Sequence, residues 1–220
     1  MMIGSTTILS SRPKVVRGAT PDRRPEGVPA WLVPSTLTYL VFPHLLFLVT
    51  WLRPEFGIAA ALSLIPATYL AARSVPGPRH GFSVPAWLGV AGFAGGMTWL
   101  SGAGDIGYQA SDWWKHNAVL TDLVQRPWPV VYDIGQPVGL DYYLAHYLPA
   151  AGAGKLIGWT GANVVLTAWT ALGLALVGFW LVALVHHAWQ WALVGFVALS
   201  GFDVIGSLLL EPLTGAPSLG

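Results

Sequence analysis

The 220-residue chain contains no cysteine, which excludes disulfide bonds, thiolate zinc sites and cysteine nucleophiles. It also has little charge, because only 10% of its residues are Asp, Glu, Lys or Arg, against about a quarter in soluble globular proteins. No P-loop, Gly-x-Ser-x-Gly elbow or His-Glu-x-x-His motif occurs, which argues against nucleotide motors, serine hydrolases and zinc proteases. Hydrophobic residues instead make up 54% of the chain. This composition indicates an integral membrane protein, with the lipid bilayer as a partner and no nucleic acid.

Apolar runs recur along the chain, and five of them predict membrane-spanning helices. About twenty residues, each rising about 1.5 Å, cross a hydrocarbon core of about 30 Å. The chain from residue 156 to residue 202 contains no Asp, Glu, Lys or Arg. We therefore predict an all-α, polytopic transmembrane protein with about five membrane helices. The predicted segments are residues 35–52, 56–72, 86–101, 163–185 and 188–210.

The chain divides into four predicted parts. Residues 1–30, rich in Ser, Thr, Pro and Arg, are expected to form a disordered, basic, cytoplasmic tail. Residues 31–103 would hold three transmembrane helices, and residues 104–158 an extracytoplasmic loop with a layer of juxtamembrane helices. Residues 159–220 would hold two further transmembrane helices and a short tail.

The basic residues predict the orientation, since Lys and Arg accumulate on the cytoplasmic side of short loops. With the N-terminus inside, the tail and the loop after the second segment together hold seven basic residues, and the other side holds four. A cytoplasmic N-terminus followed by three crossings places the loop of residues 104–158 outside the cytoplasm.

This loop is the most polar part of the apolar region, and it holds five of the ten acidic residues together with many Trp and Tyr. A flexible linker lacks large apolar side chains, so a folded surface layer is expected. One helix is predicted from Asp112 to Gln125, with Ser111 as its N-cap. A second helix is predicted over residues 138–156, with a kink at Pro149.

The loop also resembles a family. The run from Asp112 to Ala118, Asp-Trp-Trp-Lys-His-Asn-Ala, precedes Pro-Trp-Pro-Val at residues 127–130 and a Tyr-rich stretch. This order is similar to the first extracytoplasmic loop of bacterial C-type (GT-C) membrane glycosyltransferases, over roughly residues 86–212. In that superfamily the loop carries an essential Asp or Glu above a groove for a lipid carrier. Members usually have many more crossings, so the chain would match their N-terminal part, as a truncated, split or inactive relative.

The resemblance implies a bacterial inner-membrane protein that transfers a sugar from a polyprenyl-phosphate donor, or handles another lipid, on the extracytoplasmic face. A carboxylate would act there as the general base that activates the acceptor hydroxyl. Asp112 matches the family position and is the first candidate, and Asp105 is the second. The alternatives are a charge that stabilises a helix start at Asp112 and a solvated turn residue at Asp105.

A third catalytic candidate is Asp203, which lies within the last apolar segment. An ionisable group at membrane depth is costly and usually faces protein or a water-filled cavity. A structural hydrogen bond to another helix is its alternative role. Because Asp203 would sit near the outer boundary of the membrane, it is expected on the same side as Asp105 and Asp112.

Substrate contacts are assigned to residues around Asp112. His116 lies one helical turn later and can pair with it, and the basic side chains nearby can meet phosphate. Two side chains are too few for a metal site, so none is predicted. The predicted substrate-binding residues are His116, Lys115, Arg126, Trp113 and Tyr143.

A second interpretation is an accessory subunit, without catalysis, of a larger respiratory or photosynthetic membrane complex. It would dock through its Trp and Gly surfaces, and histidines would ligate haem or chlorophyll. Of the histidines only His44 lies clearly within a predicted membrane segment, so the sequence leaves the cofactor open.

Overall fold

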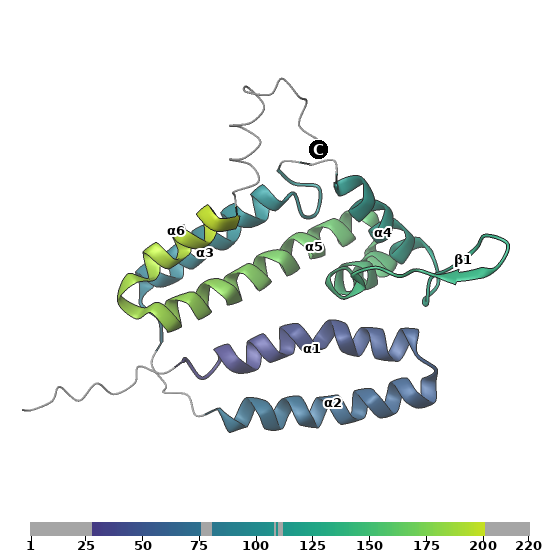
Figure 1. The fold of residues 1–220 in the computed structure, drawn as a ribbon, viewed down its shortest axis with the longest axis horizontal. Helices are drawn as coiled ribbons and strands as arrows, with labels where there is room; N and C mark the ends of the chain where they lie inside the picture. Colours follow the sequence, from purple (N-terminus) through teal and green to yellow (C-terminus); the bar gives the residue numbers. More distant parts are fainter. Residues whose placement is uncertain (1–27, 76–80, 108, 110–111, 201–220) are drawn as a thin grey trace, which may run out of the picture.

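The computed structural model describes residues 28–75, 81–107, 109 and 112–200 of the chain. Five helices run back and forth beside one another, and a smaller layer covers one end of the bundle (Figure 1). The bundle helices are α1 (Leu32–Trp51), α2 (Pro54–Ser74), α3 (Val84–Ser101), α5 (Leu148–Val185) and α6 (Trp189–Ser200). The layer contains α4 (Trp113–Gln125), the strands β1 (Val131–Asp133) and β2 (Pro137–Gly139), and the short helix η1 (Leu144–His146). A further short helix, η2 (His186–Ala188), links α5 to α6.

The helix ends follow local chemistry. Helix α2 begins with Pro54, whose missing N–H is not needed there, and it carries Glu55 in its first turn and Arg73 in its last. Helix α3 ends at Gly102, whose φ of 73° places it in the left-handed region that glycine adopts without strain. These signals explain why the first three helices lie within a few residues of the predicted segments.

Three of the described helices are long and apolar enough to cross a membrane, namely α1, α2 and α5. Many large apolar side chains on their surfaces are exposed, including Phe56, Leu62 and Leu70 on α2, as expected for a helix that faces lipid. The chain is therefore mostly helical and suited to a bilayer. The predicted number of five membrane-spanning helices is not confirmed. Helix α3 contains four glycines in 18 residues, and the described part of α6 has 12 residues, so neither is among the three.

Helix α5 corrects the predicted boundaries in the second half of the chain. The expected helix over residues 138–156 is wrong, because β2 and η1 occupy its first half and α5 begins only at Leu148. Pro149 stands at the second position of α5, where it needs no hydrogen-bond partner, and it causes no kink. The break lies at Gly158 instead, with φ 79° and ψ −176°, so α5 consists of a short segment before this residue and a long segment after it.

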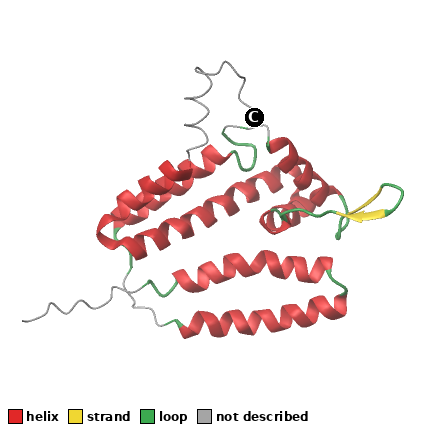
Figure 2. Ribbon diagram, viewed as in Figure 1, coloured by secondary structure: helices red, strands yellow, loops and turns green. Residues whose placement is uncertain are grey.

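The two-stranded hairpin is a departure from a purely helical fold (Figure 2). Strands β1 and β2 pair antiparallel, with Tyr132 opposite Val138. Gly135 turns the chain between them with a φ of 92°, and Pro137 and Gly139 both disfavour a helix. These residues explain why the chain forms a hairpin here, and the hairpin overlaps the start of the predicted helix at Val138 and Gly139.

Two apolar clusters hold the molecule together. One joins the layer to the bundle and contains Leu120 and Leu123 of α4, Leu148 of α5 and, at its edge, Trp51 of α1. The other lies at the opposite end of the bundle, where α1, α3 and α5 meet around Leu32, Val90 and Phe179. The layer is thus packed onto the end of the bundle where α1 ends and α5 begins.

Candidate functional site

The N-cap of α4 is Asp112, the first catalytic candidate predicted from the sequence. The carboxylate of Asp112 accepts hydrogen bonds from Lys115 Nζ at 2.6 Å and from His116 Nε2 at 2.9 Å. Its side chain is 62% exposed, against 23% for His116. The spacing of three and four residues along one helix face makes these contacts possible. Asp112 therefore presents a charged oxygen to solvent while a partly buried imidazole holds its other side.

A tyrosine completes this cluster from a distant part of the chain. Tyr147 is buried and directly precedes α5, and its hydroxyl oxygen lies 2.5 Å from His116 Nδ1. Since His116 Nε2 donates to Asp112, Nδ1 is the acceptor and the Tyr147 hydroxyl is the donor. The rings of Trp113 and Tyr147 flank the imidazole, at centroid distances of 5.2 and 6.0 Å. The result is a chain of hydrogen bonds from Tyr147 through His116 to Asp112.

The protonation states follow from these contacts. The hydrogen bond from Lys115, with that from His116, lowers the pKa of Asp112, and the same ion pair raises the pKa of Lys115. Burial raises the pKa of Tyr147 to about 12. At neutral pH Asp112 is therefore ionised and Tyr147 keeps its proton, as the chain of hydrogen bonds requires.

Two indole hydrogen bonds fix α4 at both ends. Trp113 Nε1 donates to the carbonyl of Ser101, 2.8 Å away at the end of α3, and Trp128 Nε1 donates to the carbonyl of Leu123 at 2.7 Å. At the far end of α4, Lys155 Nζ donates to the carbonyl of Arg126. Helix α4 is thus tied to α3 and to the start of α5, which places Asp112 beside the end of a bundle helix.

Arg126 does not join the Asp112 cluster. Its Nε donates to Asp122 at 2.9 Å, and the Tyr132 hydroxyl donates to the other oxygen of the same carboxylate. The guanidinium carbon also lies 5.0 Å from the centroid of the Tyr132 ring. Arg126 thus connects α4 to β1, at the opposite end of α4 from Asp112.

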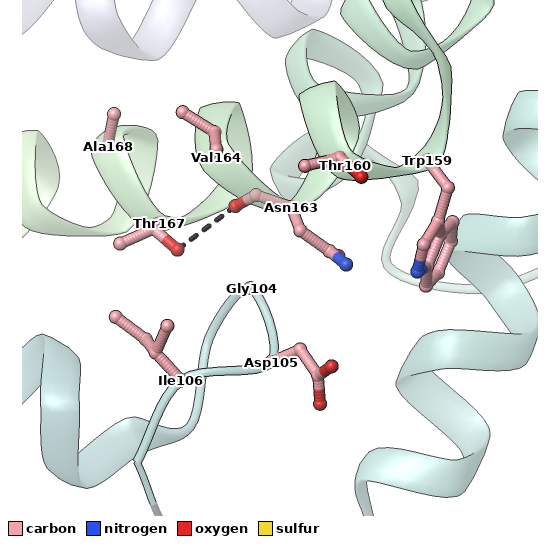
Figure 3. A pocket seen from close by; sticks show the side chains of 9 residues that line it. All are labelled: Gly104, Asp105, Ile106, Trp159, Thr160, Asn163, Val164, Thr167 and Ala168. Atoms are coloured by element: carbon pink, nitrogen blue, oxygen red, sulfur yellow. Dashed lines mark hydrogen bonds between the residues drawn. The ribbon is translucent and has the colours of Figure 1, made fainter.

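The remaining predicted residues are spread over the molecule. Tyr143 is 82% exposed and packs beside Tyr142, whose ring lies 5.8 Å from Lys115 Nζ. Asp105 belongs to a separate cavity between the end of α3 and α5 (Figure 3). Asp203 lies outside the described residues. His44 is exposed on α1, and its Nδ1 hydrogen-bonds to the Leu40 carbonyl of its own helix, 2.7 Å away.

Sequence reasoning missed two residues. Tyr147 is 31 positions from His116, so no local spacing links them. Asn163 lies in an apolar stretch of α5, and its Oδ1 is buried without a hydrogen-bond partner among the described residues. Asn163 is the first residue of the predicted segment 163–185, and a polar side chain at the boundary of a segment gives no signal.

Within the described part of the chain, no group of three or more His, Asp or Glu side chains lies close enough to hold a metal ion. No family model, no curated protein and no solved structure matches the chain.

Proposed function

We propose that this protein transfers a sugar from a polyprenyl-phosphate donor at the end of the bundle that carries α4. The observation that supports this proposal is the exposed Asp112 carboxylate, held by His116, which is held in turn by the buried Tyr147. A carboxylate that only stabilises a helix start needs no such support, whereas a catalytic base must be kept in one orientation. The family resemblance of the same stretch supports the choice of reaction.

The proposed chemistry is a single displacement. Asp112 accepts the proton of an acceptor hydroxyl, and the acceptor oxygen forms a bond to the anomeric carbon of the sugar. The bond between that carbon and the phosphate oxygen breaks, and the polyprenyl phosphate leaves with the electron pair. The lowered pKa keeps Asp112 ionised at neutral pH, so its oxygen carries no proton when the acceptor binds.

In this scheme Lys115 binds the donor phosphate. Its ammonium group pairs with Asp112 in the free protein, and the donor phosphate would compete with Asp112 for the ammonium group. The Trp113 ring lies 5.2 Å from the His116 ring, and the Tyr142 ring lies 5.8 Å from Lys115 Nζ, so both rings would contact the sugar. The proposal places the reaction at the extracytoplasmic face of the bacterial inner membrane, in line with the excess of basic residues in the tail.

An accessory subunit of a larger membrane complex is the second candidate. It is favoured by large apolar side chains that the layer exposes, such as Trp114 at 81% and Ile134 at 73%. Exposed patches of this kind often mark contacts with other proteins or with the membrane. In that case Asp112 would matter only for the local structure of α4.

Replacement of one carboxylate separates the two candidates. Asp112→Asn keeps the size of the side chain but removes the proton acceptor, so sugar transfer should fall by about a hundredfold or more, while the melting temperature falls only slightly, because Asp112 is exposed. The assay follows transfer of radiolabelled hexose from a polyprenyl-phosphate donor in membranes that contain the protein. Asp141→Asn is the matched control, since Asp141 is an exposed acid of the same layer with no ion pair in the described part of the chain. Equal activity of both variants would favour the accessory subunit.

Tyr147→Phe tests whether His116 must be held in place. The variant loses one hydrogen bond, worth about 1 kcal/mol, and the freed imidazole should lower the transfer rate by about tenfold. Combined with Asp112→Asn, it should cause little further loss, because both residues act through one chain of hydrogen bonds. Additive losses in the double variant would show that Tyr147 acts through overall stability.

A further inference from the structure

A cavity of about 590 Å³ lies apart from the Asp112 cluster, between the turn after α3 and the long segment of α5. In Figure 3 the side chains of Asp105, Trp159 and Asn163 extend toward one common space. Trp159 directly follows the break at Gly158, so the break places its indole at the end of the cavity. The apolar part of the lining comes from Ile106, Val164 and Ala168.

The turn that carries Asp105 is tightly built. Gly104 and Asp105 both have left-handed backbones, with φ of 76° and 66°. A side chain at residue 104 would collide with the Thr167 hydroxyl and the Asn163 carbonyl of α5. The Thr167 hydroxyl also donates a hydrogen bond to the carbonyl of Ala103, 3.0 Å away, and this bond holds the turn against α5. A non-glycine residue in this conformation is uncommon and is often found at binding sites.

Asn163 gives the cavity its chemical character. Its Oδ1 is shielded from solvent and has no hydrogen-bond partner among the described residues. An atom with so little accessible surface is not reached from the cavity, and Figure 3 turns the amide nitrogen of Asn163, a donor, toward the space shared with Asp105. The carboxylate of Asp105, on the other side of the cavity, is an acceptor.

One donor and one acceptor select the class of ligand. A phosphate or carboxylate headgroup would be repelled by the Asp105 carboxylate. A hydroxyl group donates to Asp105 and accepts from the Asn163 amide, and the faces of sugars or polyols pack on indole rings such as Trp159. The apolar lining and the place of α5 among the membrane-spanning helices suit the chains of a lipid.

We propose that this cavity binds the uncharged, hydroxyl-rich headgroup of a glycolipid. The inference rests on the cavity alone and is independent of any catalysis by Asp112. The Asn163 amide donates a hydrogen bond to a hydroxyl of the headgroup, Asp105 accepts one, Trp159 covers one face of the headgroup, and the lipid chains lie along α5.

The absence of cysteine from the chain allows a direct test by labelling. Ile106→Cys places a single thiol in the lining, and its rate of reaction with a maleimide is measured in phosphatidylcholine nanodiscs. Monoglucosyl-diacylglycerol at about ten times its Kd should slow the reaction about tenfold, since only the unoccupied fraction reacts. Phosphatidic acid and phosphatidylethanolamine should leave the rate unchanged. Ile134→Cys, in the hairpin, is the control and should react equally fast with each lipid.

Two variants in the Ile106→Cys background identify the recognising groups. Asn163→Leu replaces the unpaired amide with an apolar side chain of similar size, and Asp105→Gly removes the carboxylate from a backbone that glycine adopts freely. Both should fold and should abolish the protection. Unchanged protection in either variant, equal protection by phosphatidic acid, or no protection by the glycolipid would overturn the proposal.

Discussion

Two acidic residues on α4 show how neighbouring side chains decide the role of a carboxylate. Asp112 and Asp122 each pair with a basic residue and share a hydrogen-bonded cluster with a tyrosine. Asp112 is 62% exposed, however, whereas Asp122 is 28% exposed and binds Tyr132 and Arg126 directly. Burial alone would raise the pKa of Asp122, but hydrogen bonds from Tyr132 and Arg126 outweigh it and lower the pKa. Asp122 therefore fastens the hairpin, and only Asp112 has an oxygen that a substrate can reach.

His146 makes the stability of the layer depend on pH. Burial, with a contribution from the neighbouring imidazole of His116, lowers the pKa of His146 in the folded protein. The folded state therefore favours neutral His146, and its contribution to stability is present above the unfolded pKa of about 6.5. This contribution is lost as the pH falls through the folded pKa, with a limiting slope of about 1.4 kcal/mol per pH unit. The melting temperature, measured by scanning fluorimetry, should fall as the pH falls from neutral.

The matched variant for this prediction is His146→Gln. Its amide can still hydrogen-bond to the Thr170 hydroxyl, which lies 3.3 Å from His146 Nε2, but it takes up no proton. The melting temperature of the variant should depend less on pH than that of the parent protein. The same pH dependence in both proteins would mean that His146 is not the titrating group.

At the scale of the elements, the break in α5 connects the layer to the bundle. The short segment before Gly158 packs on α4 in the apolar cluster that joins the layer to the bundle, and the long segment after it belongs to the bundle. Gly154 lies against Val124 of α4, so close that any side chain at this position would have to displace it. The layer therefore takes its position from the direction in which the chain leaves Gly158.

Gly158→Ala tests this role of the break. The backbone at Gly158, with φ 79° and ψ −176°, is open essentially to glycine alone, so alanine should cost about 1–3 kcal/mol of stability. The measurement is thermal unfolding in detergent. Gly152→Ala is the control, since its new methyl group would meet only the Trp128 ring, at 3.8 Å, and alanine favours a helix by up to about 1 kcal/mol. A Gly158→Ala protein as stable as the control would show that α5 tolerates a regular helix at the break.

The whole molecule is an apolar bundle with a polar layer at one end. The layer lies at the end of the bundle that holds the turn between α1 and α2, and the last residue of α2, Ser74, lies at the opposite end (Figure 1). If the bundle spans a membrane, the two ends face different compartments. The count of basic residues predicts that the layer is outside.

Single cysteines test this orientation in intact cells. Gln136→Cys, in the hairpin, should react with a membrane-impermeant maleimide, and Ser74→Cys should react only after the cells are opened. The chain has no cysteine of its own, so each signal comes from one position. Labelling of Ser74→Cys in intact cells, with protection of Gln136→Cys, would place the layer in the cytoplasm and contradict the proposed site of transfer.

The sequence by itself determined the class of the protein and most of its helices. Scarce charge and long apolar runs predict a helical membrane protein, and the structure is mostly helical, with three helices long and apolar enough to span a bilayer. Helix α4 was also predicted to within one residue of its start, and the pairing of Asp112 with His116 followed from their spacing. These features depend on residues close together in the chain, and local spacing reveals them.

Only the tertiary structure decided the rest. The end of β2 and the short helix η1 occupy the first half of a predicted helix, and the break at Gly158 could not be distinguished by composition from the many other glycines of the chain. Tyr147 and His116, which are in contact, lie 31 positions apart in the chain. Asp105 and Asn163, which line one cavity, lie 58 positions apart (163 minus 105). Such contacts form because α4 and the turn after α3 both pack on α5. That packing is a property of the assembled bundle, and no local pattern in the sequence carries it.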